Sequence, residues 1–168
     1  KAVLRRQRKE EFVFMPKISI LVPLYKTPED YLKKMIDSVR NQSYENWELC
    51  LSDGSGADSC IRESIKKYLK EDKRIRFAYR GQALQIAENT NEAFAMSTGD
   101  YLTFLDHDDL LSADALYECV KTLNEHPDIE LIYSDEDKVT EDGKEYYLPH
   151  FKPDFNMDLL RSTNYFCH

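Results

Sequence analysis

The sequence lacks the features that mark several common classes of protein. Its longest apolar run, Ile18–Leu24, contains a serine and a proline and is far shorter than the roughly 20 residues that cross a bilayer. No stretch has the pattern of a signal peptide. No basic stripe is interleaved with aromatic residues, and the formal net charge is −8 at pH 7. Nucleic acid is therefore not expected as a partner.

Cysteines are few, and their spacing is uninformative. The chain has four of them, with no CxxC pair and no zinc-type spacing, so reduced thiols in a cytoplasmic protein are expected. The cysteines are Cys50, Cys60, Cys119 and Cys167. The first residue is Lys1 rather than methionine, which suggests a piece of a longer polypeptide whose other domains would be partners.

The 168 residues are enough for one domain with a real core. Residues 1–16 are expected to be an arm or linker that precedes it, because they combine five Lys or Arg with two Glu. Such an arm touches a membrane surface or a preceding domain, or it is a solvated linker helix. The shortness of the charge run favours the linker.

Strands and helices alternate along residues 17–168. This order predicts an α/β fold with a mostly parallel, Rossmann-like sheet flanked by helices. The expected strands are Ile18–Leu24, Trp47–Asp53, Ile75–Tyr79, Tyr101–Leu105 and Leu131–Tyr133. The fourth of these, Tyr101–Leu105, is expected to be short and buried. Four helices are expected between the strands. The first follows an N-cap at Thr27, and the second includes Ile61–Leu69. The third runs over Ala83–Ser97 with Ile86 and Phe94 inward, and the fourth follows a cap at Ser112. Asp142-Gly143 predicts a hairpin turn.

Polar residues follow four of the expected strands. In open parallel sheets ligands bind outside the carboxyl ends of the strands, so these residues are expected along one edge. They are Tyr25, Asp53, Asp106, Asp108 and Asp135.

Three carboxylates stand close together after the fourth strand. Asp106, Asp108 and Asp109 surround His107, and they would repel one another unless a cation neutralised them. Mg²⁺ or Mn²⁺ held by aspartates and water, with substrate phosphates completing the shell, would do so. The alternative is that Asp109 or Ser112 caps the next helix and the remaining aspartates are solvated turn residues.

Several nucleotide-binding schemes are excluded. The first strand is not followed by GxGxxG, and no GxxxxGK[ST] occurs, so neither a dinucleotide fold nor a P-loop is expected. The first strand also ends in Pro23-Leu24-Tyr25, where a phospho-receiver domain would carry an acidic pair.

Three separated stretches carry a family resemblance. ISILVPLYKTPEDYLKKMIDSVRNQSYENWELCLSD, GDYLTFLDHDDLLSADALYE and LIYSDEDKVTEDGKEYYLPHFKPD resemble the family 2 glycosyltransferases of GT-A fold, and most closely the bacterial enzymes of cell-surface polysaccharide assembly. The resemblance implies an inverting transfer from a nucleotide diphosphate-sugar, UDP- or dTDP-linked, to a glycan or lipid-linked acceptor. A cytoplasmic location at the inner face of the membrane would suit such an acceptor.

The resemblance also implies roles for single residues. Pro23 and Tyr25 would line the nucleoside, Asp53 would contact the base, and the Asn91 region would face the donor. Asp106, His107 and Asp108 match the DxD motif, which carries Mg²⁺ or Mn²⁺ on the donor diphosphate. The nucleotide-binding set is therefore Pro23, Tyr25, Asp53, Asn91, Asp106 and His107, and the metal ligands are Asp106 and Asp108.

This chain departs from the family pattern at several points. Ser52 replaces the first aspartate of the Asp-Asp-Gly-Ser loop, and Thr90 stands where an arginine often precedes Asn91. The catalytic base is expected beyond His168, so the GT-A domain looks truncated before its acceptor half. A non-catalytic nucleotide-binding or scaffolding domain of a multidomain polysaccharide-synthesis protein is therefore an alternative. A structural α/β domain whose acidic edge binds Ca²⁺ or nothing is another.

The C-terminal residues leave two questions open. The acidic run Asp135–Asp137 either touches the acceptor or lies at the base of a hairpin. Lys152 and the nearby aromatic residues either form a sugar platform or pack as a lid. Those aromatic residues are Tyr146, Tyr147, Phe151 and Phe155.

Overall fold

The computed structural model describes residues 2–166. The chain divides into two compact units, one ending at Pro127 and the other beginning at Asp128, and each unit has its own sheet. Among the described residues, no helix is long and apolar enough to cross a bilayer. The three described cysteines, at positions 50, 60 and 119, are free thiols, and Cys167 lies outside the described residues.

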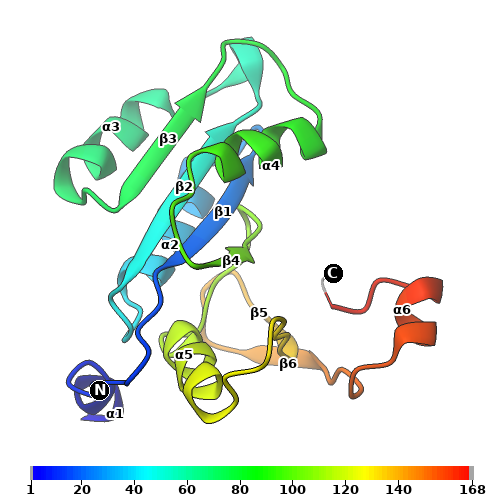
Figure 1. Ribbon diagram of the computed structural model, residues 1–168. Coiled ribbons are helices and arrows are strands. Elements are labelled where there is room, and N and C mark those ends of the chain that lie inside the picture. Colours follow the sequence, from blue (N-terminus) through cyan, green and yellow to red (C-terminus); the bar gives the residue numbers. More distant parts are fainter. Residues whose placement is uncertain (1, 167–168) are drawn as a thin grey trace. The chain divides into compact units, whose positions relative to one another are not determined.

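Four parallel strands form the sheet of the first unit, in the order β3-β2-β1-β4 (Figure 1). The strands β1 (Ile18–Leu24), β2 (Trp47–Asp53) and β3 (Ile75–Tyr79) have the predicted limits. Every residue of β1 and β2 is buried, as expected for strands covered on both faces of a parallel sheet. The predicted α/β fold with a mostly parallel sheet is confirmed.

Helices cover both faces of this sheet. The larger core lies on one face, beneath α2 (Glu29–Arg40), α3 (Arg62–Glu71) and α5 (Ala115–Glu125). On the opposite face α4 (Ile86–Ala95) packs through Ala93 onto Leu21 and Cys50. Successive strand residues point to opposite faces, so neighbouring residues of β1 contribute to different cores. Fully buried members of the larger core include Ile20, Val22, Leu24, Leu32, Met35, Ile36, Val39, Leu49, Leu51 and Val120.

The strand β4 (Tyr101–Phe104) lies at the edge of the sheet and is less buried than predicted. Leu102 is 43% exposed and Phe104 is 62% exposed, whereas Leu105 is buried. Phe104 pairs with Leu21, so it points to the face that carries α4. The prediction of a buried strand was wrong for this face, because α4 lies over β1, β2 and β3 rather than over the edge strand.

Two helices have a different N-cap from the one predicted. The sequence predicts Thr27 as the N-cap of α2, but Pro28 holds that position, and the Thr27 hydroxyl has no hydrogen-bond partner among the described residues. Proline suits this position because its φ is fixed and it has no N–H to satisfy. The cap of α5 is Asp114 rather than Ser112, whose carbonyl accepts a hydrogen bond from the Ala115 amide.

A short helix, α1 (Ala2–Gln7), precedes the sheet within the first unit. The division between an arm and a domain at residue 16 stays a prediction.

The second unit contains an antiparallel hairpin and a short helix. The hairpin pairs β5 (Glu136–Val139) with β6 (Tyr146–His150), and α6 (Met157–Ser162) follows. The predicted turn at Asp142-Gly143 is confirmed, with Gly143 at a φ of 72°. Leu131–Tyr133 is not the fifth strand of the parallel sheet, and Leu131 is 56% exposed. That prediction was wrong because an apolar run does not specify a pairing partner.

Candidate functional site

The order of the strands locates a site at the carboxyl edge of the first sheet. From β1 the chain moves to β2 and β3 on one side, and then returns to β4 on the other side of β1 (Figure 1). This reversal of direction is a topological switch point, where open α/β sheets bind ligands. The residues that follow β1 and β4 flank this point.

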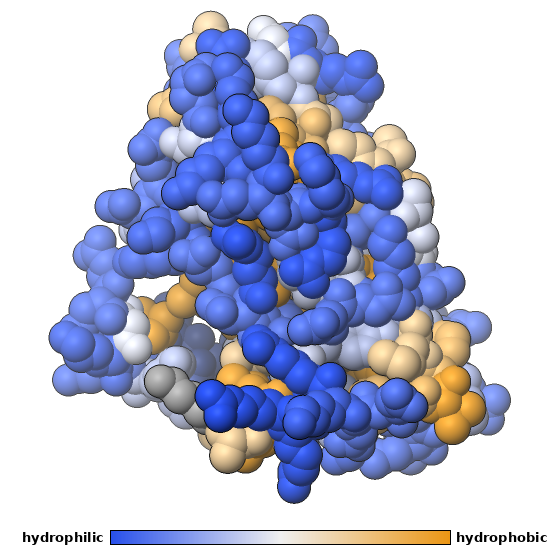
Figure 2. All heavy atoms as spheres, turned by 90° about the vertical axis from the view of Figure 1, so that its left-hand side faces the viewer, coloured by the Kyte–Doolittle hydropathy of each residue, from blue (hydrophilic) through white to orange (hydrophobic). Residues whose placement is uncertain are grey.

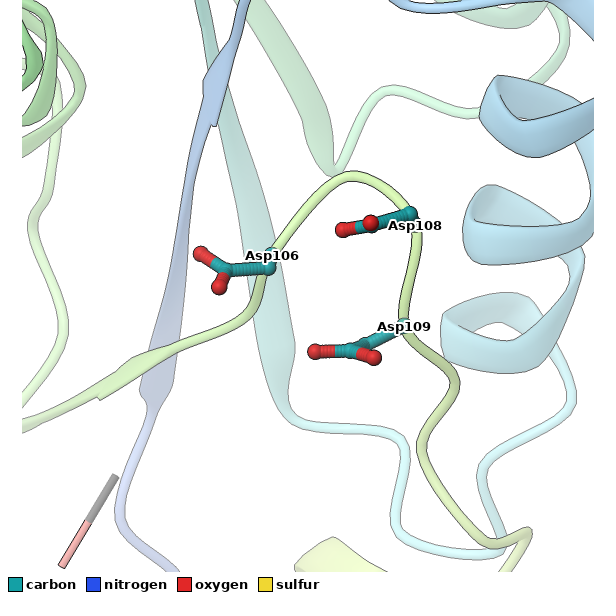
Figure 3. A group of neighbouring side chains, drawn as sticks. All are labelled: Asp106, Asp108 and Asp109. Atoms are coloured by element: carbon teal, nitrogen blue, oxygen red, sulfur yellow. The ribbon is translucent and has the colours of Figure 1, made fainter. Parts of the chain in front are cut away.

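Three aspartates gather directly after β4. Each of Asp106, Asp108 and Asp109 offers an oxygen that lies within 4.8 Å of the others. Figure 3 shows that all three come from one short stretch of chain, and that the carboxylates of Asp108 and Asp109 extend in the same direction, toward the Asp106 side of the loop. The Asp109 amide donates to the Asp106 carbonyl over 3.2 Å, which closes the turn that brings the side chains together.

This group of oxygens fits a hard divalent cation. Mg²⁺ and Mn²⁺ prefer carboxylate oxygens, and Mg²⁺ usually keeps open positions for water or substrate phosphate. The three residues are at least partly exposed, so a phosphate group can reach an ion held there. The structure thus brings the predicted ligands Asp106 and Asp108 together, and it adds Asp109, which the sequence places in the cluster but not in the ligand set. His107 is half-buried and is not part of this group.

The turn that leaves β1 has a left-handed residue. Lys26 has a φ of 47°, its amide donates to Ser55 Oγ over 2.8 Å, and its Nζ lies 2.8 Å from Asp58 Oδ2. The hydrogen bond with Asp58 raises the pKa of Lys26 and lowers that of Asp58. Tyr25 is 49% exposed, whereas Pro23 is buried within β1. Of the two residues predicted to line a nucleoside, Tyr25 is therefore the accessible one.

Backbone strain at Lys26 leads to a testable prediction. A residue other than glycine costs about 1–2 kcal/mol in this conformation, and asparagine tolerates it best. We expect Lys26→Asn to raise the free energy of unfolding by about 0.5–1 kcal/mol in urea titrations, because the exposed pair with Asp58 contributes little. The control is Lys33→Asn in the middle of α2, which should lower stability slightly through helix propensity. Destabilisation by Lys26→Asn would show that the lysine side chain matters more than its backbone.

Asp53 organises the loop after β2. It is fully buried, and its Oδ1 accepts hydrogen bonds from the Ser55 amide at 3.0 Å and the Ser55 hydroxyl at 2.5 Å. Its Oδ2 accepts a hydrogen bond from the Ser59 hydroxyl. The Ser55 hydroxyl in turn accepts the Lys26 amide, so Asp53 acts through Ser55 on the turn after β1. Direct contact of Asp53 with a base stays a prediction.

Asn89 is a residue of this edge that sequence reasoning missed. It is 2% exposed, and its Nδ2 donates to the Leu24 carbonyl over 2.9 Å, at the end of β1. The same carbonyl accepts the Gly54 amide over 3.0 Å. A Cβ on Gly54 would lie 2.8 Å from Asn89 Nδ2, so glycine is needed for this close approach. Asn89 thereby ties α4 to the ends of β1 and β2.

The predicted inward face of α4 was wrong. Ile86 is 73% exposed and Phe94 is 52% exposed, whereas Asn89 and Ala93 are buried. The helix is also shorter than the predicted range of residues 83–97. Asn91, the predicted donor-facing residue, is exposed. The run of poor helix formers around residues 88–91 was the signal that could have identified Asn89.

The acidic run of the second unit has partners of its own. Asp135 Oδ1 accepts the Lys152 amide over 2.8 Å, and Glu136 Oε2 accepts Lys152 Nζ over 3.0 Å. His150 Nδ1 lies 3.1 Å from Glu136 Oε1. The prediction that Asp135 ends a strand of the parallel sheet was wrong, because Asp135 precedes β5 of the second unit. These contacts fit the alternative that the acidic run lies at the base of a hairpin.

The aromatic residues around β6 are mostly open to solvent. Tyr146, Tyr147 and Phe151 are 69%, 46% and 75% exposed. Phe155 packs against Phe166, with ring centroids 6.2 Å apart. Lys152 has a buried side chain and also donates to the Phe166 carbonyl. A sugar platform on the exposed rings stays a prediction.

Comparison with known sequences identifies relatives. The family model for glycosyl transferase family 2 matches residues 19–168. The O-antigen biosynthesis protein RfbC of Myxococcus xanthus is 34% identical over 153 residues, which is 91% of this chain and 12% of that protein. Two curated relatives that match over 91% of the chain are much longer than it, since it spans 17% and 12% of their lengths.

Comparison with solved structures identifies the fold. TarS 1-349 of S. aureus, in complex with UDP-GlcNAc, aligns with a TM-score of 0.60 at 20% identity, over 66% of this chain and 32% of that one. The mannosyltransferase PcManGT of Pyrobaculum calidifontis, in complex with GDP-Man and Mn²⁺, aligns with a TM-score of 0.58 at 19% identity, over 73% and 38%. Both support the fold predicted from the sequence, a GT-A-like sheet flanked by helices.

Proposed function

The chain belongs to glycosyl transferase family 2, and we propose that it supplies the donor-binding part of an enzyme that transfers a sugar from a nucleotide diphosphate-sugar to a glycan or lipid-linked acceptor. One observation carries this proposal. Three aspartate oxygens gather within 4.8 Å at the topological switch point of the sheet. The RfbC relative supports surface-polysaccharide synthesis as the setting.

Asp106, Asp108 and Asp109 would hold Mg²⁺ or Mn²⁺ in this proposal. Such an ion offsets the negative charge that develops on a nucleoside diphosphate as the sugar–phosphate bond breaks. The PcManGT complex, which contains GDP-Man and Mn²⁺, supports this assignment. The aspartates follow β4, which pairs with β1, so an ion that they held would lie near the carboxyl end of β1, and the diphosphate would bind there.

The nucleoside would lie on the opposite side of the end of β1, toward β2. Asp53 is opposite Leu24 in the register of β1 and β2, and Tyr25 follows Leu24. In this arrangement Tyr25 would contact the nucleoside. Asp53, Ser55 and Asn89 would fix the backbone beneath it through the hydrogen bonds described above. His107 and Asn91 stay as proposed contacts of the donor.

The proposed reaction inverts the configuration at the anomeric carbon. A single displacement needs a carboxylate that takes the proton of the acceptor hydroxyl on the face opposite the leaving diphosphate. No described residue is assigned this role, and we place the base in the acceptor half of the enzyme.

A non-catalytic nucleotide-binding or scaffolding domain is the second candidate. The replacement of the usual first loop aspartate by Ser52 favours it, as does the engagement of both Asp53 oxygens within the protein. Both candidates bind a nucleotide, and only the first also transfers sugar. An assay of sugar transfer from a nucleotide-sugar to an acceptor distinguishes them.

Calorimetric titration of the chain tests the nucleotide and metal site. UDP, dTDP and GDP would each be added in the presence of Mn²⁺ and again with a chelator. We expect one nucleotide to bind measurably with Mn²⁺ and to lose at least about tenfold in affinity without it, since the ion bridges protein and diphosphate. Equal binding in both conditions, or no binding of any nucleotide, would contradict the proposal.

A further inference from the structure

The N-terminal segment, residues 2–15, differs in charge from the rest of the chain. The first 17 residues have six Lys or Arg and two Glu, a formal charge of +4, whereas the total of −8 leaves −12 for the remaining residues. Four cationic side chains lie within five positions, and all four are exposed. These are Arg5, Arg6, Arg8 and Lys9. Such a cluster attracts an anionic surface, although the protein as a whole is acidic.

Exposed apolar side chains follow these cations in the sequence. Val13, Phe14 and Met15 are consecutive, and they are 105%, 44% and 46% exposed. Single exposed apolar residues are ordinary, but three together next to a basic cluster form an amphipathic surface. Figure 2 shows hydrophobic residues among strongly hydrophilic ones on the face that it draws.

The backbone of residues 14–16 is fixed to the first unit. The Phe14 amide donates to Asn124 Oδ1 over 2.9 Å, and Asn124 Nδ2 donates back to the Phe14 carbonyl over 2.8 Å. Asn46 Nδ2 donates to the Met15 carbonyl, and the Tyr44 hydroxyl donates to the Pro16 carbonyl. A flexible linker would not be held by three side chains. The backbone that carries Phe14 and Met15 is therefore fixed. The Phe14 ring lies edge-on to Tyr101, with the ring centroids 6.3 Å apart, and Met15 and the neighbouring Val13 stay exposed.

The basic part of the segment is held as well. Gln7 is 5% exposed, and the Tyr117 hydroxyl donates to Glu10 Oε2 over 2.7 Å. The rings of Phe12 and Tyr117 lie 5.3 Å apart. The same element, α5, thus holds both the cationic and the apolar parts of the segment.

We propose that the N-terminal segment is a docking surface for an anionic lipid bilayer. The four cationic side chains would meet phosphate headgroups, and Val13 and Met15 would enter the acyl boundary. These are two signals for membrane binding, a polybasic patch and apolar insertion. Neither signal alone gives stable attachment, but the two together do. The observations that carry this inference do not depend on the proposed function. If both are correct, the donor site is held at the surface where a lipid-linked acceptor lies.

Vesicle sedimentation with the 168-residue chain tests the proposal. The probes are vesicles of phosphatidylcholine alone and of phosphatidylcholine mixed with phosphatidylglycerol. We expect the chain to sediment with the anionic vesicles only, and to lose at least about tenfold in affinity when salt rises from about 0.1 M to about 1 M. Failure to bind anionic vesicles would overturn the proposal in favour of a protein partner. Equal binding to both vesicles would overturn the role of charge.

Two sets of variants locate the surface. Arg5→Glu with Lys9→Glu, and separately Val13→Ser with Met15→Ser, should each weaken binding at least about fivefold, since each removes one of the two signals. The matched control is Lys66→Glu with Lys67→Glu on α3, which changes the net charge equally on a helix whose exposed face also carries acidic residues. An equal loss in the control would mean that net charge alone acts and would overturn the assignment. Circular dichroism of every variant establishes that the fold is retained.

Discussion

Asp108→Asn is expected to abolish metal-dependent nucleotide binding, with a loss of at least about 100-fold in affinity in the presence of Mn²⁺. In the proposed site the neutral amide would remove one of the three carboxylates, with Asp106 and Asp109, that would offset the charge of the ion. Even residues that only support metal ligands cost about 10–100-fold when they are changed. Calorimetry of the variant against the nucleotide that binds the native chain measures the loss.

The same variant separates a metal site from a structural role. Without metal, one repelling carboxylate is gone, so the melting temperature of Asp108→Asn should equal that of the native chain or exceed it. Asp30→Asn is the matched control, because Asp30 is an exposed acid in the first turn of α2 and its loss should leave nucleotide binding unchanged. A large drop in the melting temperature of the metal-free Asp108 variant would mean that this carboxylate supports the fold instead.

The sequence was sufficient to predict three of the four strands of the parallel sheet. The strands β1, β2 and β3 begin and end at the predicted residues, because each is a short run with apolar residues that is bounded by polar residues and alternates with a helical pattern. The strand β4 and the second unit were predicted less well. The outer face of β4 is exposed, and Leu131–Tyr133 is not a strand, because burial and pairing depend on neighbours that a local pattern does not specify.

The buried face of α4 could not be predicted from the spacing of its apolar residues. A helix is expected to turn its large apolar side chains inward, yet Ile86 and Phe94 are exposed and Asn89 is buried. The surface beneath Asn89 is not apolar there, since it presents the Leu24 carbonyl and the backbone of Gly54. An amide donor satisfies that carbonyl and an apolar side chain does not. This requirement for a hydrogen-bond donor cannot be predicted from the sequence of α4, because it arises only where the ends of β1 and β2 lie side by side.

The candidate site was predictable in its charges but not in its hydrogen bonds. The aspartates after β4 are adjacent in sequence, so their proximity follows from the turn. The network of Asp53, Ser55 and Lys26 joins the ends of two strands, and only the sheet register brings these residues together. Their roles toward a donor stay predictions that the titrations above can test.

Glu48, which the sequence analysis did not single out, anchors the amino end of the sheet. It lies within β2, its side chain is 2% exposed, and its carboxylate accepts hydrogen bonds from the Ser19 hydroxyl at 2.7 Å and from the Thr98 amide. Lys17 Nζ lies 2.7 Å from its Oε2 and Arg76 Nη2 lies 3.1 Å from it. One carboxylate therefore connects the segment before β1, the strands β1 and β3, and the segment before β4. A buried carboxylate with this many donors is costly to remove.

Glu48→Ala should lower the free energy of unfolding by about 3–5 kcal/mol, because it leaves Lys17 and Arg76 without their shared partner. Glu71→Ala removes an exposed carboxylate that pairs with Arg40 and should cost less than about 1 kcal/mol. Urea unfolding of both variants measures the difference. Similar small losses in the two variants would show that the buried contacts of Glu48 contribute no more than a surface ion pair.

The pH dependence of Glu48→Gln tests the charge of this residue separately. Burial alone would raise the pKa of Glu48, but hydrogen bonds from Lys17, Ser19 and Thr98 outweigh it and lower the pKa from 4.5 to about 2. The folded state therefore favours the ionised form, which contributes roughly 3 kcal/mol above pH 4.5. That contribution is lost as the pH falls from 4.5 toward 2, whereas glutamine has no charge to lose. The native chain should accordingly be more stable than Glu48→Gln at neutral pH, and the gap should narrow in acid. A gap that stays constant from pH 7 to about pH 3 would mean that the hydrogen bonds, and not the charge, hold this end of the sheet.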